Sequence, residues 1–369
     1  MRDVLRQVRA WYGEGLGLAT VVGTWQSAPR QPGAAMAVSA AGEAAGSVSG
    51  GCVEGAVYEV AQSVLETGEP SLQRYGVSDD DAMAVGLTCG GIIDVFVQPV
   101  SPETFPELPV IASAIEDHQP VAVATVVSVS AESRPAVGAR VLVWPDRAEG
   151  SLGVEGLDIA VVDDARGMLS TGVTGLRDYG PHGERRRDEV GVFVESYAPP
   201  PRMLVFGAID YAAAVAKIGK FLGYRVTVCD ARPIFATKAR FPDADEVIVE
   251  WPHRYLSRTP VDARSVICVL THDPKFDVPL LEVALRTPAA YIGAMGSRRT
   301  HDDRLARLRA AGLSDAELEW LASPIGLDIG ARTPEETAVS VAAEIVALQW
   351  GASGRRLSDT EGRIHGPGL

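Results

Sequence analysis

The feature that most constrains this chain is an internal repeat. Pairing each residue from 46 to 76 with the residue 104 positions later gives 11 identities in 31 pairs, where chance gives roughly two. The strand-like sequence ATVV also occurs twice, at 19–22 and at 124–127. Each copy is expected to contain two strands, a Gly-Ser turn, a helix and a closing strand, at 92–97 or at 189–194. The repeat predicts two similar units; the alternative is two unrelated α/β stretches that share turn residues.

A second fold signature follows the proline-rich stretch SYAPPPR at 196–202, which has the composition of a domain linker. An apolar strand leads into Gly207, a helix follows, and a second strand ends at Asp230, 23 positions after that glycine. This order is typical of dinucleotide-binding folds, in which the acidic residue binds ribose hydroxyls. Further strands of a doubly wound sheet are expected at 246–250, 265–272 and 289–296.

The phosphate-binding fingerprint of such folds is incomplete in this chain. Against the pattern GxGxxG/A the sequence has Gly207, Ile209 and Ala212. The middle glycine normally lets the backbone approach a pyrophosphate, and Ile209 places a branched side chain there. The fold prediction therefore stands, whereas binding of NAD(P) is doubtful.

Together these signals predict an α/β protein with two domains. An N-terminal α+β domain at 1–198 is built from the duplication, with repeats at about 15–100 and 119–198. A Rossmann-like, doubly wound domain follows at 202–350, and a polar, glycine-rich tail at 351–369.

Composition excludes several classes of function. The net charge of −14 argues against nucleic-acid binding, which usually needs a basic face. Four cysteines without a CxxC pair do not form a disulfide scaffold. No apolar run approaches the ~18 residues of a membrane span, and the first residues do not resemble a signal peptide. We therefore expect a cytoplasmic protein without an integral membrane segment.

The sequence GSVSGGCVEG at 46–55 is the strongest candidate site. Apolar residues at helical spacing follow Cys52, so this thiol is expected near a helix N-terminus, where backbone N–H groups favour an anion and lower a thiol pKa. Opposite Cys52 the second copy has Gly156, and the GLTCGG segment with Cys89 has no counterpart there. The two thiols are therefore predicted to share a pocket; the alternative is that Cys52 is a small buried hydrophobe.

A second candidate region is a phosphate or nucleotide site in the Rossmann-like domain. Gly207 and Asp230 are its nucleotide-binding candidates. Ser297, Arg298 and Arg299 precede a helix that we expect Thr300 to cap, and such a segment can bind phosphate. The alternative is that the two arginines are simply solvated.

Several long motifs in this order resemble the XdhC/CoxI family. They are SAPRQPGAAM (27–36), GSVSGGCVEGAV (46–57), LTCGG (87–91), YIGAMGSRR (291–299) and PIGLDIGARTPEETAVSVAAEI (324–345). These family members are accessory proteins that mature xanthine dehydrogenase and carbon monoxide dehydrogenase. One departure is the turn Gly207-Ala208-Ile209-Asp210, where the family usually has GAGH.

The resemblance implies a maturation chaperone rather than an enzyme. Such a protein binds molybdenum cofactor (molybdopterin or its dinucleotide form), supports its sulfuration and delivers it to an apo molybdenum hydroxylase. A cysteine desulfurase and a second copy of the chain are further candidate partners. The candidate cofactor-binding residues are Cys52, Cys89, Ser47, Ser49, Gly50, Gly51, Glu54, Gly90, Gly91 and Arg30.

The expected chemistry divides these residues by role. The Cys52 thiolate is a soft ligand suited to contact molybdenum, and the glycine-loop amides are expected to receive the phosphate, with Arg30 adding positive charge. The alternative function is a nucleotide-dependent oxidoreductase that acts on the cofactor or a small substrate. A protein that itself oxidises purines is disfavoured, because the sequence lacks the cysteines of iron–sulfur clusters.

Overall fold

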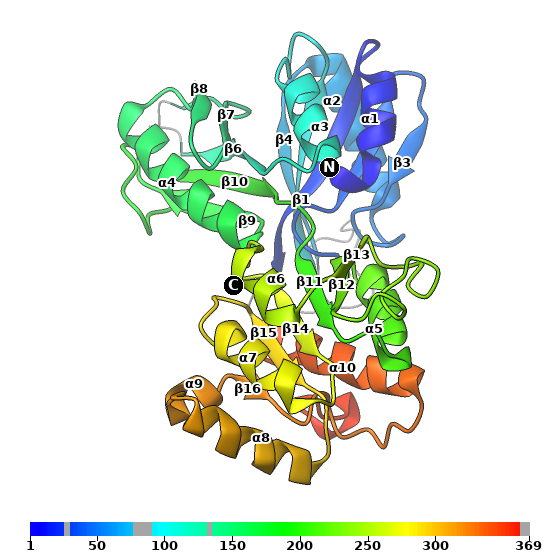
Figure 1. The fold of residues 1–369 in the computed structure, drawn as a ribbon. Coiled ribbons are helices and arrows are strands. Elements are labelled where there is room, and N and C mark those ends of the chain that lie inside the picture. Colours follow the sequence, from blue (N-terminus) through cyan, green and yellow to red (C-terminus); the bar gives the residue numbers. More distant parts are fainter. Residues whose placement is uncertain (26–29, 77–90, 131–134, 362–369) are drawn as a thin grey trace. The chain divides into compact units, whose positions relative to one another are not determined.

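The computed structural model describes residues 1–25, 30–76, 91–130 and 135–361. The described chain divides into two compact units (Figure 1). The boundary along the sequence falls between Pro199 and Pro200, inside the proline-rich segment. Each unit has its own sheets and its own core.

The N-terminal unit contains two five-stranded antiparallel sheets with the same strand order, β3-β2-β1-β5-β4 and β8-β7-β6-β10-β9. The first sheet consists of β1 (Leu16–Trp25), β2 (Ala35–Ser39), β3 (Ala44–Gly46), β4 (Ser71–Tyr75) and β5 (Ile92–Val100). The second consists of β6 (Val121–Val129), β7 (Arg140–Val143), β8 (Ala148–Ser151), β9 (Gly175–Tyr179) and β10 (Val190–Tyr197). Because the two sheets have the same strand order, the predicted internal duplication is confirmed.

Each copy places one long helix between its third and fourth strands, α2 (Glu54–Thr67) in the first and α4 (Glu155–Thr171) in the second. Both helices end at a glycine that adopts positive φ, Gly68 at 73° and Gly172 at 71°, as a left-handed C-cap requires. α2 buries Val57, Ala61 and Val64, which lie on one helical face, against its own sheet.

The two copies pack against each other in a nearly symmetric way. An ideal Cβ at Gly33 would lie 3.3 Å from Thr174 Cγ2, and one at the corresponding Gly138 would lie 3.6 Å from Pro70 Cγ. A shared apolar cluster joins the sheets; it contains Val22, Phe96, Val127 and Phe193. η1 (Arg2–Val4), α1 (Leu5–Trp11) and α3 (Leu108–Glu116) complete the unit. The N-terminal unit is thus a pseudo-dimer within one chain.

The C-terminal unit is a parallel six-stranded sheet in the order β13-β12-β11-β14-β15-β16, which is the Rossmann order 3-2-1-4-5-6. Its strands are β11 (Arg202–Phe206), β12 (Arg225–Asp230), β13 (Glu246–Val249), β14 (Val266–Val269), β15 (Tyr291–Ala294) and β16 (Leu321–Ala322). Its helices are α5 (Asp210–Phe221), α6 (Pro252–Arg258), α7 (Pro274–Ala284), α8 (Arg298–Ala310), α9 (Asp315–Leu318) and α10 (Pro334–Gln349), with η2 (Leu357–Asp359) beyond them. α5 and α10 pack on one face, while α6, α7 and α8 cover the other.

Two helix caps in this unit bear on the sequence predictions. Thr333 caps α10 with Glu336 in a capping box, as expected for a Thr-Pro-Glu-Glu start. The prediction that Thr300 caps α8 is wrong, because Ser297 is the cap and its Oγ accepts from the Thr300 amide at 3.2 Å. Ser297 takes this position because its backbone is extended, at φ −76° and ψ 167°, which is the conformation of an N-cap.

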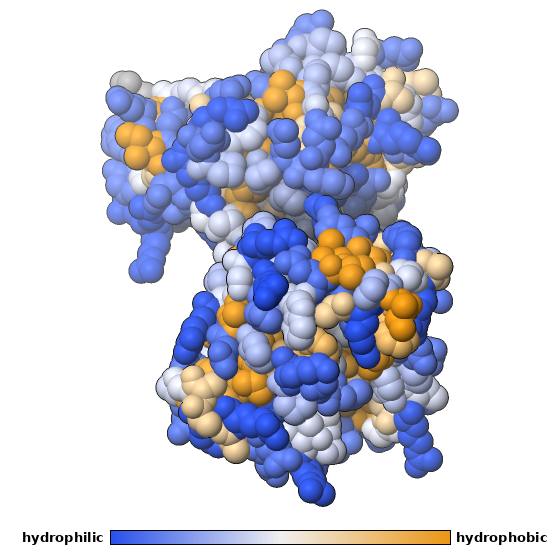
Figure 2. Space-filling model, viewed as in Figure 1, coloured by the Kyte–Doolittle hydropathy of each residue, from blue (hydrophilic) through white to orange (hydrophobic). Residues whose placement is uncertain are grey.

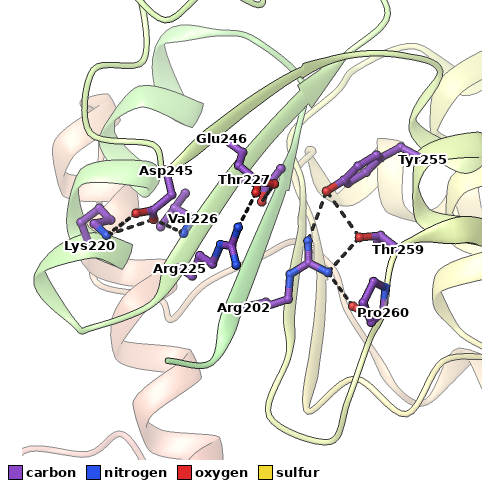
Figure 3. A network of polar contacts seen from close by, with 10 residues as sticks. All are labelled: Arg202, Lys220, Arg225, Val226, Thr227, Asp245, Glu246, Tyr255, Thr259 and Pro260. Carbon is purple, nitrogen blue, oxygen red and sulfur yellow. Dashed lines mark hydrogen bonds and ion pairs between the residues drawn. The ribbon is translucent and has the colours of Figure 1, made fainter. Parts of the chain in front are cut away.

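Hydrogen bonds and ion pairs connect the residues at the amino-terminal edge of this parallel sheet (Figure 3). Arg202 Nη1 donates to Thr259 Oγ1 at 2.8 Å and to the Pro260 carbonyl oxygen at 2.7 Å. Asp245 accepts from Lys220 Nζ at 2.8 Å. Since ligands of doubly wound sheets bind at the carboxyl edge, these contacts are part of the scaffold.

Within the described ranges, none of the helices combines the length and the apolar character that a bilayer span requires.

Candidate functional site

The loop that carries Cys52 connects β3 to α2. Val53 is the N-cap, so α2 begins two residues after Cys52, as the sequence predicted. Gly50 and Gly51 adopt φ of +80° and +117°, which a residue with a side chain rarely does. Apart from the adjacent residues of the chain, no atom lies within 4 Å of either Cβ position, so the loop leaves open space beside the two glycines that precede Cys52.

The carboxylate of Glu54 folds back into this loop and accepts five hydrogen bonds. Glu54 Oε1 accepts from Ser47 Oγ at 2.5 Å, from the Ser49 amide at 2.9 Å and from the Gly50 amide at 3.1 Å. Glu54 Oε2 accepts from Ser49 Oγ at 2.5 Å and from the Gly51 amide at 2.8 Å. Burial alone raises the pKa of Glu54, but hydrogen bonds from Ser47 and Ser49 outweigh it and lower the pKa to about 2. The structure thus brings four of the predicted site residues, Ser47, Ser49, Gly50 and Gly51, around the carboxylate of a fifth, Glu54.

This arrangement changes the expected role of the loop amides. The sequence assigns the amides of Ser49, Gly50 and Gly51 to the phosphate of a cofactor, but in the structure they donate to Glu54 instead. Successive amides that converge on one point form a concave anion site. Here a carboxylate of the chain itself fills that site.

Cys52 lies between the loop and the core of the first copy. Its side chain is half-buried and packs against the apolar cluster under α2. Its amide donates to Ser49 Oγ at 2.9 Å, so the same hydroxyl that binds Glu54 also holds the backbone of Cys52. Cys229 and Cys268 differ, because they are fully buried and burial raises the pKa of each to about 12. Among these three thiols, Cys52 is the most accessible.

The corresponding loop of the second copy is arranged differently. Asp158 occupies the position of Glu54, and it accepts from Ser151 Oγ and from the Leu152 amide, each at 2.6 Å. However, α4 already begins at Glu155, so these positions form a turn of helix. Gly156, at the position of Cys52, is covered by backbone: its ideal Cβ would lie 2.3 Å from the His182 carbonyl oxygen.

The other predicted N-terminal site residues lie apart from this network or beyond the described part of the chain. Cys89 and Gly90 fall outside the described residues, so the shared pocket with Cys52 stays a prediction. Gly91 lies at the start of β5, with its carbonyl oxygen 3.2 Å from the Cβ position of Gly76. Arg30 Nη2 donates to Asp3 Oδ2 at 3.1 Å in an exposed ion pair.

In the Rossmann domain, the predicted ribose acceptor is already engaged. Gly207 forms the turn after β11 with a φ of +109°. Asp230 is buried and accepts from the Ala208 amide at 2.7 Å and from Arg232 Nε at 2.9 Å and Nη2 at 2.8 Å. Burial raises the pKa of Asp230, but the bonds from Arg232 and Ala208 outweigh it and lower the pKa. Both of its oxygens are therefore occupied from within the chain.

The start of α5 also differs from a pyrophosphate site. Ile209 is the N-cap and packs against the core, and Asp210 carries a negative charge in the first turn of the helix. Arg240 Nη2 lies 3.3 Å from Asp210 Oδ1. Since a helix N-terminus attracts anions, the negative charge of Asp210 in the first turn of α5 disfavours a pyrophosphate there.

The carboxyl edge of β12 and β13 carries exposed apolar side chains. Ile234, Val249 and Trp251 are 74%, 51% and 41% exposed, and the Trp251 and Phe276 rings lie 5.1 Å apart. Figure 2 shows hydrophobic side chains gathered on this part of the C-terminal unit. Exposed patches of this kind often mark contact surfaces.

Ser297, Arg298 and Arg299 form an exposed segment at the N-terminus of α8. Among the residues that the structure describes, neither arginine side chain has a hydrogen-bond or ion-pair partner. Beneath the segment, buried Arg304 pairs with Asp277 at 3.1 Å.

Comparison with known proteins places the chain. The XdhC and CoxI family matches residues 12–76 and 114–180, and the XdhC Rossmann domain matches residues 203–345. This chain belongs to the XdhC/CoxI family. The resemblance predicted from its motifs is thereby confirmed, and so is the Rossmann fold of the second domain.

Two relatives and one solved structure extend the comparison. A Bacillus subtilis (strain 168) protein, described as a probable xanthine dehydrogenase subunit, is 28% identical over 333 residues, covering 89% of this chain and 92% of the relative. The Escherichia coli (strain K12) molybdenum cofactor insertion chaperone PaoD is 24% identical over 337 residues, covering 91% of this chain and 84% of PaoD. A Bacillus halodurans crystal structure described as a xanthine dehydrogenase has a TM-score of 0.67 and 24% identity, and covers 97% of this chain and 98% of its own. That structure supports the fold of this XdhC/CoxI member.

Proposed function

We propose that this chain is a maturation chaperone that binds molybdenum cofactor, supports its sulfuration and delivers it to an apo molybdenum hydroxylase. The observation that carries the proposal is the match to PaoD, a molybdenum cofactor insertion chaperone, over 91% of this chain. A cysteine desulfurase and a second copy of the chain are the further partners we propose.

The Cys52 loop is the proposed binding point for this cargo. The thiol of the half-buried Cys52 is a soft donor that suits a metal–sulfur centre, and the open space beside Gly50 and Gly51 leaves room for a bulky group. Cys89, Gly90 and Gly91 are proposed to contribute from the second glycine segment. Because Glu54 fills the loop's anion site, we assign the phosphate of the cofactor to Arg30. Ser297, Arg298 and Arg299 stay a separate candidate phosphate site within the Rossmann domain.

The alternative function, a nucleotide-dependent oxidoreductase, draws support from the strand order of the Rossmann domain. The paired Asp230, the branched Ile209 and the acidic Asp210 disfavour NAD(P) at the usual site. A protein that itself oxidises purines is also disfavoured: two iron–sulfur clusters need about eight cysteine ligands, and the sequence has four cysteines.

Purification from a molybdate-supplied host tests the proposal. Mass spectrometry and metal analysis of the isolated protein are expected to find a pterin and molybdenum in equal amounts. Titration with NADH up to about 1 mM is expected to show no saturable binding. NADH turnover by protein that contains no pterin would overturn the chaperone assignment in favour of the oxidoreductase.

A further inference from the structure

We infer that Glu54 is a positioning residue that holds the Cys52 loop in its open shape, and that it does not bind the cargo. The inference rests on the proposed function only in taking Cys52 as the cofactor contact. Its physical basis lies entirely within residues 47–54, all of which the structure describes.

Ser49 links the Glu54 carboxylate to the backbone of Cys52. Ser49 Oγ accepts from the Cys52 amide at 2.9 Å and from the Val53 amide at 3.0 Å, and it donates its own proton to Glu54 Oε2 at 2.5 Å. The Ser49 side chain is buried, so water does not replace a lost partner freely. The Glu54 carboxylate therefore fixes the orientation of the hydroxyl that holds Cys52.

The other carboxylate oxygen, Glu54 Oε1, accepts from Ser47 and from two loop amides. Ser47 Oγ donates to Glu54 Oε1 at 2.5 Å and accepts from the Gly50 amide at 2.8 Å. The amides of Ser49, Gly50 and Gly51 also donate to the Glu54 carboxylate, so all of these groups act as donors towards it. A glutamine has one acceptor oxygen and an NH₂ group that itself donates, so it leaves at least one of these donors without an acceptor.

The second copy has a smaller version of this network around Asp158. Asp158 accepts from Ser151 Oγ over the same seven-residue spacing, and within the described part of the chain its one further donor is the Leu152 amide. There the Gly153 amide donates to Ser151 Oγ at 2.9 Å, and α4 begins two residues later. The longer Glu54 also accepts from the amides of Ser49, Gly50 and Gly51, so in the first copy the carboxylate holds the loop backbone as well as the serine.

The test compares Glu54→Gln with Asp158→Asn, its matched control in the second copy, and with Glu54→Asp. Two quantities are measured. The first is the rate at which iodoacetamide alkylates Cys52 in protein from a molybdate-free host, with the modified peptide located by mass spectrometry. The second is molybdenum bound per chain in protein from a molybdate-supplied host.

For Glu54→Gln we expect the alkylation rate of Cys52 to change by about tenfold and bound molybdenum to fall by a similar factor, because a charged hydrogen-bond network is lost. Glu54→Asp, which keeps the charge, is expected to lie between this variant and the unmodified chain. Asp158→Asn is expected to leave both quantities unchanged. Should Glu54→Gln not fold, Ser49→Ala carries the same expectation, since it removes the hydroxyl that joins Glu54 to the Cys52 and Val53 amides and leaves the carboxylate in place.

Two results would overturn the inference. If Glu54→Gln lowers bound molybdenum but leaves the alkylation rate unchanged, Glu54 contacts the cargo directly. If neither quantity changes, Glu54 has no role in the site. A lack of molybdenum in the unmodified chain counts against the proposed function instead, and the alkylation rates then decide the positioning role alone.

Discussion

The two copies of the N-terminal unit share a sheet order, a helix and a serine–carboxylate pair, yet they differ where that pair meets the helix. In the first copy, α2 begins at Glu54, and Cys52 precedes it in an open loop. In the second, α4 begins three residues before Asp158, and Gly156 lies inside the helix under the His182 carbonyl. The first copy thus lacks the first helical turn that the second copy has, and a loop with the half-buried Cys52 takes its place.

Backbone conformation explains why only the first copy is unwound. Gly50 and Gly51 have positive φ, which is incompatible with a right-handed helix. At the corresponding positions the second copy has Val154 and Glu155, and the helix starts directly after the extended Val154. The scaffold is therefore common to both copies, whereas the candidate site depends on four or five loop residues.

The largest expected effect comes from Cys52→Ala. The variant is expected to lose its bound molybdenum, because the soft donor is gone. Its stability is expected to fall by less than the ~2–5 kcal/mol of a large aliphatic truncation, because Cys52 is only half-buried. Metal analysis and thermal melting of the same preparation check both statements. A variant that melts early but loads normally would show that Cys52 is a core residue.

The matched change in the second copy, Gly156→Ala, is expected to do the reverse. Its new Cβ would lie 2.3 Å from the His182 carbonyl oxygen, so the backbone must shift, at a cost of about 1–3 kcal/mol. Bound molybdenum is expected to stay at the level of the unmodified chain. Loss of molybdenum without loss of stability would break the distinction between site and scaffold.

A smaller effect concerns pH. The folded pKa of Glu54 is about 2, below its ordinary value of 4.5, so its ionised form stabilises the fold at pH values above 4.5. This contribution is lost as pH falls from 4.5 towards 2, because protonation then breaks the network. Melting temperatures of the unmodified chain and of Glu54→Gln are therefore expected to differ most above pH 4.5 and to converge near pH 2. A difference that stays constant over this range would contradict the assigned network.

The sequence predicted the fold well because the fold depends on patterns spread over many residues. The 104-residue repeat indicated two similar units, and the apolar strands around Gly207 indicated a parallel sheet; the structure has both. The position of Cys52 before α2 also followed from helical spacing.

Individual hydrogen-bond partners are harder to predict, because they depend on the path of the backbone. The sequence groups Glu54 with the cofactor-binding residues, yet its carboxylate folds back onto Ser47 and Ser49. The signal that could have shown this is the seven-residue serine–acid spacing, which recurs at Ser151 and Asp158. Likewise, Asp230 matches the spacing of a ribose acceptor, but Arg232 two residues later takes its oxygens.

The most direct test of the central claim, that the first copy carries the site and the second is scaffold, is a loop exchange. Residues 47–54, SVSGGCVE, are replaced by the SLGVEGLD of residues 151–158, and bound molybdenum is measured per folded chain. The account predicts that molybdenum falls to the level of Cys52→Ala while the circular dichroism spectrum keeps its α/β form. An exchanged chain that still binds as much molybdenum as the unmodified protein would contradict it.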